Sequence, residues 1–521
     1  MEIIKIKVRG DRRSMWKKFR QSPDGNLGDS ISSNDLLNED INITVAQITE
    51  ALGNSSDLII RFIKHGENST AFAIVHIDGI TNTQKINEHI INPLLANQYN
   101  LDYESIKAKL EQTITLSNIK EKNTYKPILS GIVSGSTVIF IDGDTSAFIL
   151  DTKEIESRSI AEPTTQTVIR GPKDSFTENL RTNTSLVRSR IQSPDLRIES
   201  MIIGEVTQTA VEIMYIKDIA KDVIVVEVKN RLKKIKIDGI LESSYIENFI
   251  QDEKHTPFPT VQNTERPDEV VGNLLEGRIA IFINGTPYAL IVPVTFMQLF
   301  QSPEDYYQNQ YIGSFLRILR LAAFFLALYA PAVYVAMITH HHALVPTVLL
   351  VSIAAQREAI PFPAIVEAFI MEVTFEVLRE AGIRMPRAVG SALSIVGALI
   401  LGQAAVEAGF VSAAMVIIVS VTAIASFALP NYNLGIAARI LRFLLLIVAS
   451  YAGLYGVLIA SLIIGMHMCG LRSFGVPYLA PIAPFRLNEQ KDVLFRSSLQ
   501  NLVYRPSTAK NENRVRIRKK E

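Results

Sequence analysis

The sequence predicts a cytoplasmic α/β N-terminal region of two mixed α/β subdomains, followed by an all-α polytopic transmembrane domain. The chain has 521 residues, which exceeds the usual size of one domain. Its mean hydropathy is +0.19 although 20% of the residues are charged. Charged residues recur every few positions before Arg320, whereas long apolar runs follow it. This distribution indicates a chain that is divided between water and lipid.

Composition excludes several classes of function. Lys and Arg number 53 against 52 Asp and Glu, so no global positive field points to nucleic acid. A single cysteine excludes an internal disulfide framework and multi-cysteine metal sites. The sequence contains no Walker loop, hydrolase elbow or HExxH motif. We therefore expect no cofactor, no metal and no enzymatic activity.

The order of polar and apolar segments predicts five regions. The first twenty residues lack the apolar core of a secretory signal, so we expect the N-terminal part to be cytoplasmic. The expected regions are a mobile arm (1–40), a first subdomain (41–160), a second subdomain (161–310), a transmembrane helical domain (311–470) and a cytoplasmic basic tail (471–521).

Two hairpins are predicted in the N-terminal region. Thr137–Leu150 has two apolar strands around an Asp-Gly turn, and Arg278–Val292 repeats the pattern around Asn-Gly. The match leaves two explanations open, which are an internal repeat and coincidence.

Five apolar stretches follow Arg320. A helical span needs about 20 apolar residues to cross about 30 Å of hydrocarbon. Four of the stretches satisfy this length, while Ala343–Ala355 is short and is expected to be re-entrant or to continue into the next turn. The stretches are Leu321–Ile338, Ala343–Ala355, Ala388–Val406, Val411–Leu429 and Phe443–Met468.

An acidic helix is predicted over Pro361–Gly382. Three carboxylates at four-residue spacing form one stripe on it, namely Glu372, Glu376 and Glu380. Acids inside a membrane domain are costly unless they meet water or bases. The favoured interpretation is an interfacial helix with solvated carboxylates, and the alternative is a pore-facing or intersubunit stripe. Arg379 and Arg384 are the expected partners of Glu376 and Glu380.

The arginines Arg439 and Arg442 pose a topological problem. They are expected in a loop between two spans, which the positive-inside rule places in the cytoplasm. The same rule places the basic tail in the cytoplasm, yet the predicted span Phe443–Met468 separates the tail from the two arginines. Both assignments hold only if that segment folds back on itself.

Three further polar features have a structural and a functional interpretation. The histidines His340–His342 are expected to be interfacial loop residues, with pH sensing as the alternative. Cys469 is expected to be packed. A basic run is expected to be a salt-bridged helix with its connector, or else an interface between subunits or between the two subdomains. Its members are Arg170, Lys173, Arg181, Arg188 and Arg190.

Several stretches resemble one family. RGPKDSFTENLRTNTSLVRSRI (Arg170–Ile191) is the most specific, with IDGITNTQKINEHIINPLL (Ile77–Leu95) and SPEDYYQ (Ser302–Gln308) beside it. PFPAIVEAFIMEVTFEVLREAGIRMPR and SIVGALILGQAAVEAGFVSAAMVIIVSVTAIASF complete the match. With these residues the chain is similar to the A subunits of the GerA-type spore germinant receptors, from about Asp57 to Ser498.

The resemblance implies a multi-pass protein of the spore inner membrane. It implies partnership with a transporter-like B subunit and a lipoprotein C subunit, homo-oligomerisation, contact with membrane lipid and a nutrient-gated ion channel. Germinant recognition would lie mainly in the B subunit. The alternative is a secondary transporter for the nutrient or a coupled ion, although the chain has too few clear spans for a duplicated core.

Overall fold

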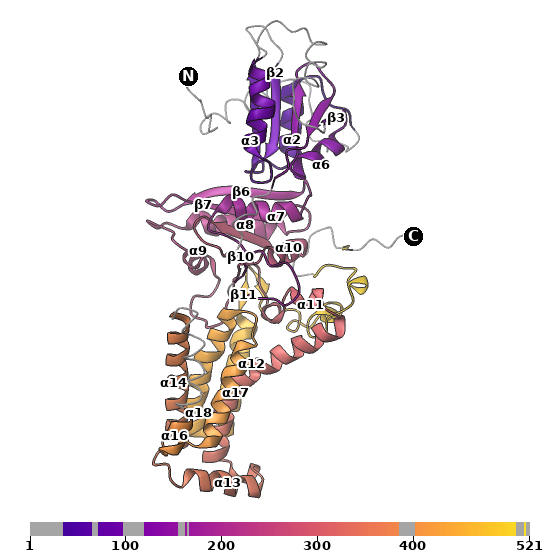
Figure 1. The fold of residues 1–521 in the computed structure, drawn as a ribbon. Coiled ribbons are helices and arrows are strands. Elements are labelled where there is room, and N and C mark those ends of the chain that lie inside the picture. Colours follow the sequence, from indigo (N-terminus) through magenta and orange to yellow (C-terminus); the bar gives the residue numbers. More distant parts are fainter. Residues whose placement is uncertain are drawn as a thin grey trace.

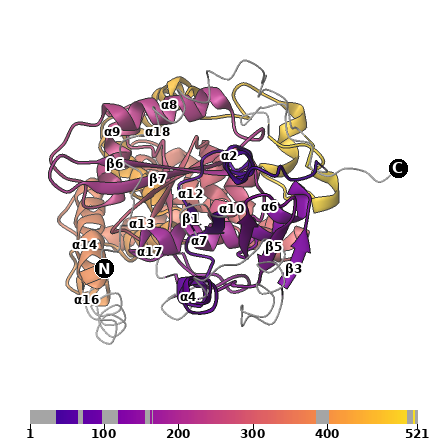
Figure 2. The same cartoon turned by 90° about the horizontal axis from the view of Figure 1, so that it is seen from above.

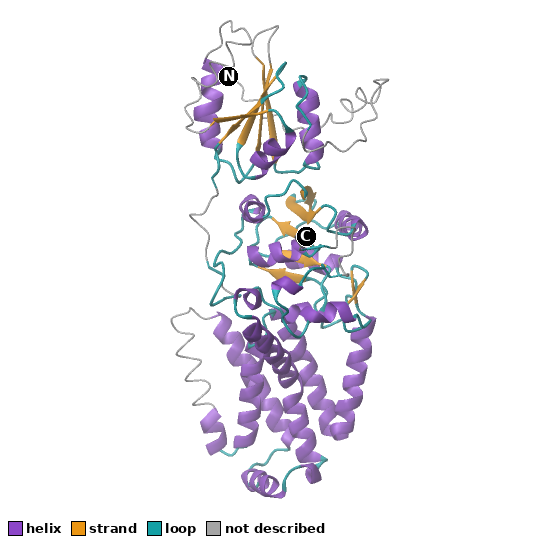
Figure 3. Cartoon of the chain, turned by 90° about the vertical axis from the view of Figure 1, so that its right-hand side faces the viewer, coloured by secondary structure: helices purple, strands orange, loops and turns teal. Residues whose placement is uncertain are grey.

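The structure is a computed structural model that describes residues 35–64, 71–96, 119–154, 162–163, 166–384, 402–506 and 515–516. The described residues form three tiers, in which two α/β units stand above a helical bundle (Figure 1). Figure 3 shows a separate sheet in each upper tier and only helices below. The predicted fold class, α/β followed by all-α, is therefore confirmed. Most of the predicted N-terminal arm lies outside the described residues.

The first unit is a five-stranded antiparallel sheet in the order β1-β2-β4-β5-β3. Helices α2 and α6 pack on one face, and α3 with the helices after it packs on the other. The elements are α2 (Ile41–Ala51), β1 (Leu58–Lys64), β2 (Ala71–Ile77), α3 (Thr83–Ile86), η1 (Asn87–Ile91), α4 (Asn92–Ala96), β3 (Ile119–Lys122), α6 (Tyr125–Val133), β4 (Thr137–Ile141) and β5 (Ala147–Leu150).

The second unit repeats this topology, with the strand order β6-β7-β9-β10-β8. Helices α8 and α9 cover one face and α7 and α10 the other, so α7 and α8 flank β7 from opposite sides (Figure 2). Its elements are α7 (Leu180–Arg190), β6 (Leu196–Ile203), β7 (Thr209–Ile216), α8 (Asp222–Lys234), α9 (Ser243–Ile250), β8 (Gln262–Thr264), α10 (Pro267–Leu275), β9 (Ile279–Ile283) and β10 (Ala289–Val292).

The two predicted hairpins are β4–β5 and β9–β10, and they hold equivalent places in the two sheets. Each follows a short strand and a helix, which are β3 and α6 in the first unit and β8 and α10 in the second. This equivalence favours an internal repeat over coincidence.

The rest of the chain forms a connecting segment, a helical bundle and a C-terminal segment. Apolar side chains of η2 (Phe296–Phe300), α12 and α18 form one continuous core with Phe258 and Val294 of the second unit. The elements are η2 (Phe296–Phe300), α11 (Glu304–Tyr307), α12 (Gln310–Thr339), η3 (His342–Leu344), α13 (Thr347–Arg357), α14 (Ala364–Arg384), α16 (Gly402–Glu407), α17 (Ala413–Phe427), α18 (Tyr432–Gly470), β11 (Arg472–Ser473), β12 (Val476–Pro477), η5 (Leu487–Asp492) and η6 (Leu499–Asn501).

Among the described helices, two are long and apolar enough to cross a membrane, namely α12 and α18. Of the four predicted full-length spans, Leu321–Ile338 lies in α12 and Phe443–Met468 in α18, whereas Val411–Leu429 forms only the shorter α17. Helix α17 has 15 residues and begins after Ser412, which caps its N-terminus by accepting the Met415 N–H. Helix α13 has 11 residues. The predicted span Ala388–Val406 lies mostly outside the described residues.

Helix α18 is a hairpin of two helices that reverses at Gly453. This glycine has φ 58° and ψ −147°, a conformation that interrupts the helix. A Cβ on Gly456 would lie 3.0 Å from the carbonyl oxygen of Val448, eight residues earlier. In a straight helix those residues would be about 12 Å apart. The predicted segment Phe443–Met468 therefore folds back, which is the arrangement in which both charge assignments can hold.

Both ends of α18 return to the second unit. Asn431, just before the helix, lines a cavity together with Gln262 of β8. Ser473, just after it, donates a 2.7 Å hydrogen bond to the Thr260 carbonyl. The expectation that Arg439 and Arg442 lie in a loop is wrong, because α18 begins at Tyr432 and includes both.

The histidine loop packs against this reversal. His340 Nε2 lies 2.8 Å from the Ser450 carbonyl oxygen, which the helix break leaves without its usual partner. The His341 ring lies 5.5 Å from the Tyr455 ring, centroid to centroid. The loop position agrees with the first interpretation of the three histidines, and their contact with Gly453 was not predicted.

We predict that Gly453→Ala destabilises the bundle by about 1–3 kcal/mol, because a Cβ there would meet His341 Cε1 at 2.6 Å and the backbone lies at positive φ. Gly465→Ala is the matched control, since Gly465 lies in the second half of α18 with nothing within 4 Å. It should stabilise by up to about 1 kcal/mol through helix propensity. Thermal unfolding of the detergent-solubilised protein measures both. Equal midpoints for the two variants would contradict the reversal.

Candidate functional site

A buried ion pair joins the two α/β units. Arg188 of α7 is 1% exposed, and its Nε donates to Asp57 Oδ2 at 2.9 Å while Nη2 donates to Oδ1 at 3.1 Å. Asp57 lies directly before β1 of the first unit. Ser55 accepts a further bond from Nη2 at 3.0 Å. This bidentate geometry is the strongest that an arginine and a carboxylate form, so it fixes the units against each other.

A second contact between the units involves Arg181, also on α7. Its Nε lies 3.2 Å from Asp78 Oδ2 after β2, and its Nη2 lies 3.3 Å from Glu212 Oε1 on β7. Glu212 is 1% exposed, and burial raises the pKa of its carboxyl group although Arg181 opposes the shift. The first unit thus contacts α7 through two arginines.

The other members of the predicted basic run lie outside this contact. Arg190 binds Asp174 at 2.6 Å, Lys173 pairs with Glu162 at 3.2 Å on the surface, and Arg170 is exposed. The structure therefore brings together Arg181 and Arg188 but not the whole run. A role for these residues in contacts between subunits stays a prediction.

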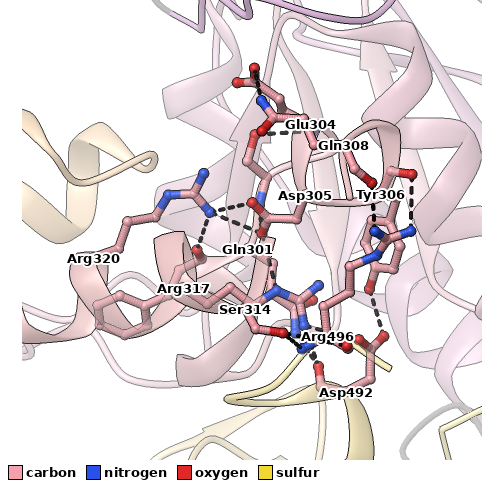
Figure 4. Close-up of polar contacts among 12 residues, drawn as sticks. Gln301, Glu304, Asp305, Tyr306, Gln308, Ser314, Arg317, Arg320, Asp492 and Arg496 are labelled. Atoms are coloured by element: carbon pink, nitrogen blue, oxygen red, sulfur yellow. Dashed lines mark hydrogen bonds and ion pairs between the residues drawn. The ribbon is translucent and has the colours of Figure 1, made fainter. Parts of the chain in front are cut away.

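A third cluster connects the second unit to the bundle, in the stretch Ser302–Gln308 and the start of α12 (Figure 4). Asp305 is completely buried, and its Oδ2 accepts from Arg317 Nε at 3.1 Å. Arg320 Nη1 donates to both oxygens of the same carboxylate, at 2.8 and 2.9 Å. One turn of α11 is thereby bound to the first turns of α12, and we name this cluster the joint.

The C-terminal segment completes the joint. Asp492 accepts from Arg317 Nη1 at 2.9 Å and from the Tyr306 hydroxyl at 2.6 Å, and burial raises the pKa of the aspartate. Arg496 donates to the carbonyls of Gln308 and Tyr306 at 2.7 and 3.2 Å. This part of the predicted tail is consequently packed against α11 and α12. The sequence did not indicate this contact, because the tail is far from these helices along the chain.

The predicted acidic stripe lies in the bundle and splits into different environments. Glu372 is completely buried, and its Oε2 lies 2.8 Å from Nη2 of Arg442, which is 1% exposed. Glu376 pairs with Arg439 at 2.9 Å and lies 3.7 Å from Arg442. The favoured interpretation, solvated carboxylates on an interfacial helix, is wrong for Glu372 because α14 packs against α18.

The outer end of the stripe follows the sequence expectation. Glu380 pairs with Arg384 at 2.6 Å, and both side chains are largely exposed. The spacing predicted that Arg379 pairs with Glu376, and this prediction is wrong. The Arg379 guanidinium lies instead over the rings of Phe427 and Tyr432, at 5.2 and 5.8 Å from their centroids.

Glu367 is a buried acid that the sequence analysis missed. It is completely buried, with Arg357 Nε at 3.1 Å and the Ser412 backbone N–H donating to it at 3.0 Å. It therefore ties α13, α14 and the start of α17 together. The available signal was an acid in the first turn of a helix, ten residues after an arginine.

A cavity of about 240 Å³ lies where the second unit, the joint and the α17–α18 connection meet. Glu269 of α10 lines it and accepts hydrogen bonds from the side chains of Gln262 and Thr264. Burial raises the pKa of Glu269 to about 7, so this carboxyl group is largely uncharged just below neutral pH. No cluster of metal-ligating side chains exists within the described ranges.

These features define a class of protein, in which a duplicated α/β module is connected through buried ion pairs to a bundle of apolar helices. The family model described as "Bacillus/Clostridium GerA spore germination protein" matches residues 46–508. The chain therefore belongs to the GerA spore germination family, which confirms the predicted resemblance.

Similar proteins agree with this assignment. "Spore germination protein KA" of Bacillus subtilis (strain 168) is 49% identical over 92% of this chain and 89% of its own length. "Uncharacterized membrane protein YfkQ" of the same organism is 46% identical over 89% and 90%. "Spore germination protein GerLA" of Bacillus cereus is 38% identical over 91% and 96%.

A solved structure is also similar in sequence. It is the crystal structure of the N-terminal domain of the A subunit of the Bacillus megaterium spore germinant receptor GerK3, 40% identical, covering 51% of this chain and 99% of that chain, with a TM-score of 0.41.

We predict that Arg188→Met destabilises the protein by about 3 kcal/mol or more, because it leaves Asp57 as an uncompensated buried charge. Lys173→Met is the control, since its pair with Glu162 is exposed and should contribute less than about 1 kcal/mol. Urea unfolding of the full chain in detergent, followed by circular dichroism, measures the difference. If both variants unfold at the same urea concentration, the Arg188–Asp57 pair does not stabilise the contact between the units.

Proposed function

We propose that the chain is the A subunit of a nutrient (germinant) receptor in the spore inner membrane. In this proposal the bundle crosses the membrane several times and forms, with further copies, an ion channel that a nutrient opens. A transporter-like B subunit and a lipoprotein C subunit complete the receptor, and recognition of the nutrient lies mainly in the B subunit. Family membership and the printed names of the relatives support the role in germination.

One observation carries the channel proposal, namely the buried ion pairs inside an apolar bundle. Glu372 and Arg442 are 0% and 1% exposed among helices of high hydropathy. Ionisable side chains at membrane depth are costly, and they usually mark a pathway for ions or protons. Glu376 and Arg439 extend the pairs toward the second unit, so the charged groups form a row along the bundle.

The joint supplies a route from the α/β units to that row. Arg317 and Arg320 lie in the first three turns of α12, and the same helix continues, with Pro331 in its interior, to Thr339. A ligand or partner that binds one arrangement of the α/β units better would shift the population of bundle states that fit it. Since Asp305 binds both arginines, a displacement of α11 would be carried directly to α12.

Cys469 offers a test of the topology. The structure corrects the expectation that it is packed, because its side chain is exposed at the end of α18 that returns to the second unit. We predict that a membrane-impermeant maleimide labels it from the side where the α/β units are accessible to protease. As control, a Cys469→Ser variant with Leu344→Cys, in the loop at the other end of α12, should react only from the opposite side. Labelling of both cysteines from one side would contradict this topology.

We predict that Glu372→Gln reduces cation conductance of the reconstituted receptor by about tenfold or more, because Arg442 then loses its nearer carboxylate and the row gains one net positive charge. Glu380→Gln is the matched control, since its exposed pair with Arg384 should leave conductance nearly unchanged. Recordings need the complete receptor with candidate nutrients. Unchanged conductance in Glu372→Gln would remove the pore role, and accumulation of radiolabelled nutrient without current would favour a transporter.

A further inference from the structure

The cavity beside the joint presents unused hydrogen-bond donors. Arg320 lines it, and its bonds to Asp305 and to the Phe300 carbonyl all come from Nη1. Within the residues that the structure describes, Nε and Nη2 of Arg320 have no partner, as Figure 4 shows for the residues drawn there. Ser302 Oγ accepts a bond from the Glu304 N–H. Gln166 Oε1 lies 2.6 Å from the Thr264 hydroxyl, whose single proton can serve only one of Gln166 and Glu269. The Ser302 hydroxyl and the Gln166 side-chain NH2 have no acceptor among the described residues.

The acidic groups that line the cavity have hydrogen-bond donors of their own. Glu269 accepts a hydrogen bond from the Gln262 amide and lies close to the Thr264 hydroxyl, and its raised pKa keeps much of it uncharged near neutrality. Glu304 accepts from the Gln308 amide at 2.6 Å. Arg266 is held by Asp268 at 2.7 Å and adds no free charge. The volume of about 240 Å³ corresponds to about eight water molecules at about 30 Å³ each, enough for a small anionic group.

A second positive charge lies across Phe427 from the cavity. Phe427 lines the cavity, and Arg379 lies over its ring. Arg379 Nη1 is buried and, among the described residues, has no hydrogen-bond partner. It belongs to a cluster with one more arginine than carboxylates, made of Arg379, Arg439, Arg442, Glu372 and Glu376. An anion near Phe427 would reduce this excess.

An exposed apolar ridge on α17 leads to the same place. Its members recur at intervals of three or four residues, as one face of a helix requires, and each is at least 42% exposed. They are Ile417, Val421, Ile424 and Phe427. The ridge ends at Phe427, which also lines the cavity. Tyr432, a residue type that is enriched at membrane interfaces, is exposed nearby.

We propose that the cavity binds the phosphate headgroup of an anionic phospholipid, with Arg320, Ser302 and Gln166 as donors and an acyl chain along the α17 ridge. Basic pockets between membrane helices at the cytoplasmic side are suited to such headgroups. A soluble phosphate ester would use the same donors but not the ridge, so the ridge favours the lipid. The lipid would bridge the second unit, the joint and α17. The proposal rests on the membrane location proposed above.

The test uses the full chain reconstituted in phosphatidylcholine vesicles with and without phosphatidylglycerol. After detergent extraction and washing, mass spectrometry measures the phosphatidylglycerol retained per protein. Arg320→Gln and Arg379→Gln should each retain about fivefold less than the parent chain, the factor that corresponds to about 1 kcal/mol per basic residue near an anionic surface. Arg384→Gln, five residues beyond Arg379 on the same helix, is the matched control and should retain as much as the parent chain.

Because Arg320 also binds Asp305, a folding defect could mimic its effect, and Arg379→Gln keeps the test independent of the joint. Equal retention in Arg379→Gln and Arg384→Gln would overturn the proposal. If glycerol 3-phosphate displaces the lipid at equal concentration, the ligand is a soluble phosphate ester and the lipid assignment is wrong. A chain that enters no vesicle would refute the membrane location itself, whereas insertion without selective retention refutes only the lipid site.

Discussion

A carboxylate that stays ionised in the protein interior needs a cation beside it, and this requirement determines how the three tiers are connected. Asp305 has no exposure to solvent and is shared by Arg317 and Arg320. Breaking a buried pair by removing one partner typically costs several kcal/mol. Helix α12 therefore has one favourable direction in which to leave the second unit. The packing of the bundle against that unit depends on this direction.

The same physical device recurs at each junction of the chain. Arg188 with Asp57 connects the two α/β units, and Glu372 with Arg442 connects α14 to the first half of α18. Replacing such pairs with apolar side chains often costs little stability, so what they add is a defined geometry. A fixed geometry at each junction suits a protein that transmits a signal between tiers. Each tier can then switch between discrete arrangements instead of moving gradually through many intermediate positions.

Some of the fold and the site was predictable from local pattern. The hairpins β4–β5 and β9–β10 were read from turn residues between apolar runs, and the bundle from the apolar runs themselves. The sequence also singled out acidic residues and arginines that do form ion pairs in the structure. Their partners were not predictable, because Glu376 and Arg439 are 63 residues apart and Arg188 and Asp57 are 131 apart. Spacing on one helix wrongly favoured Arg379 for Glu376, since it accounts only for neighbours within a few turns.

The sequence by itself determined the division into an α/β part and an apolar part, and the family, and it raised the question of whether Phe443–Met468 folds back. These properties depend on composition and short-range pattern, which every segment carries on its own. Only the tertiary structure decided that Gly453 makes the reversal, that Glu372 is buried and that residues near Asp492 close the joint. Burial and pairing of a charge depend on which distant segment covers it, and that is a property of the whole packed chain.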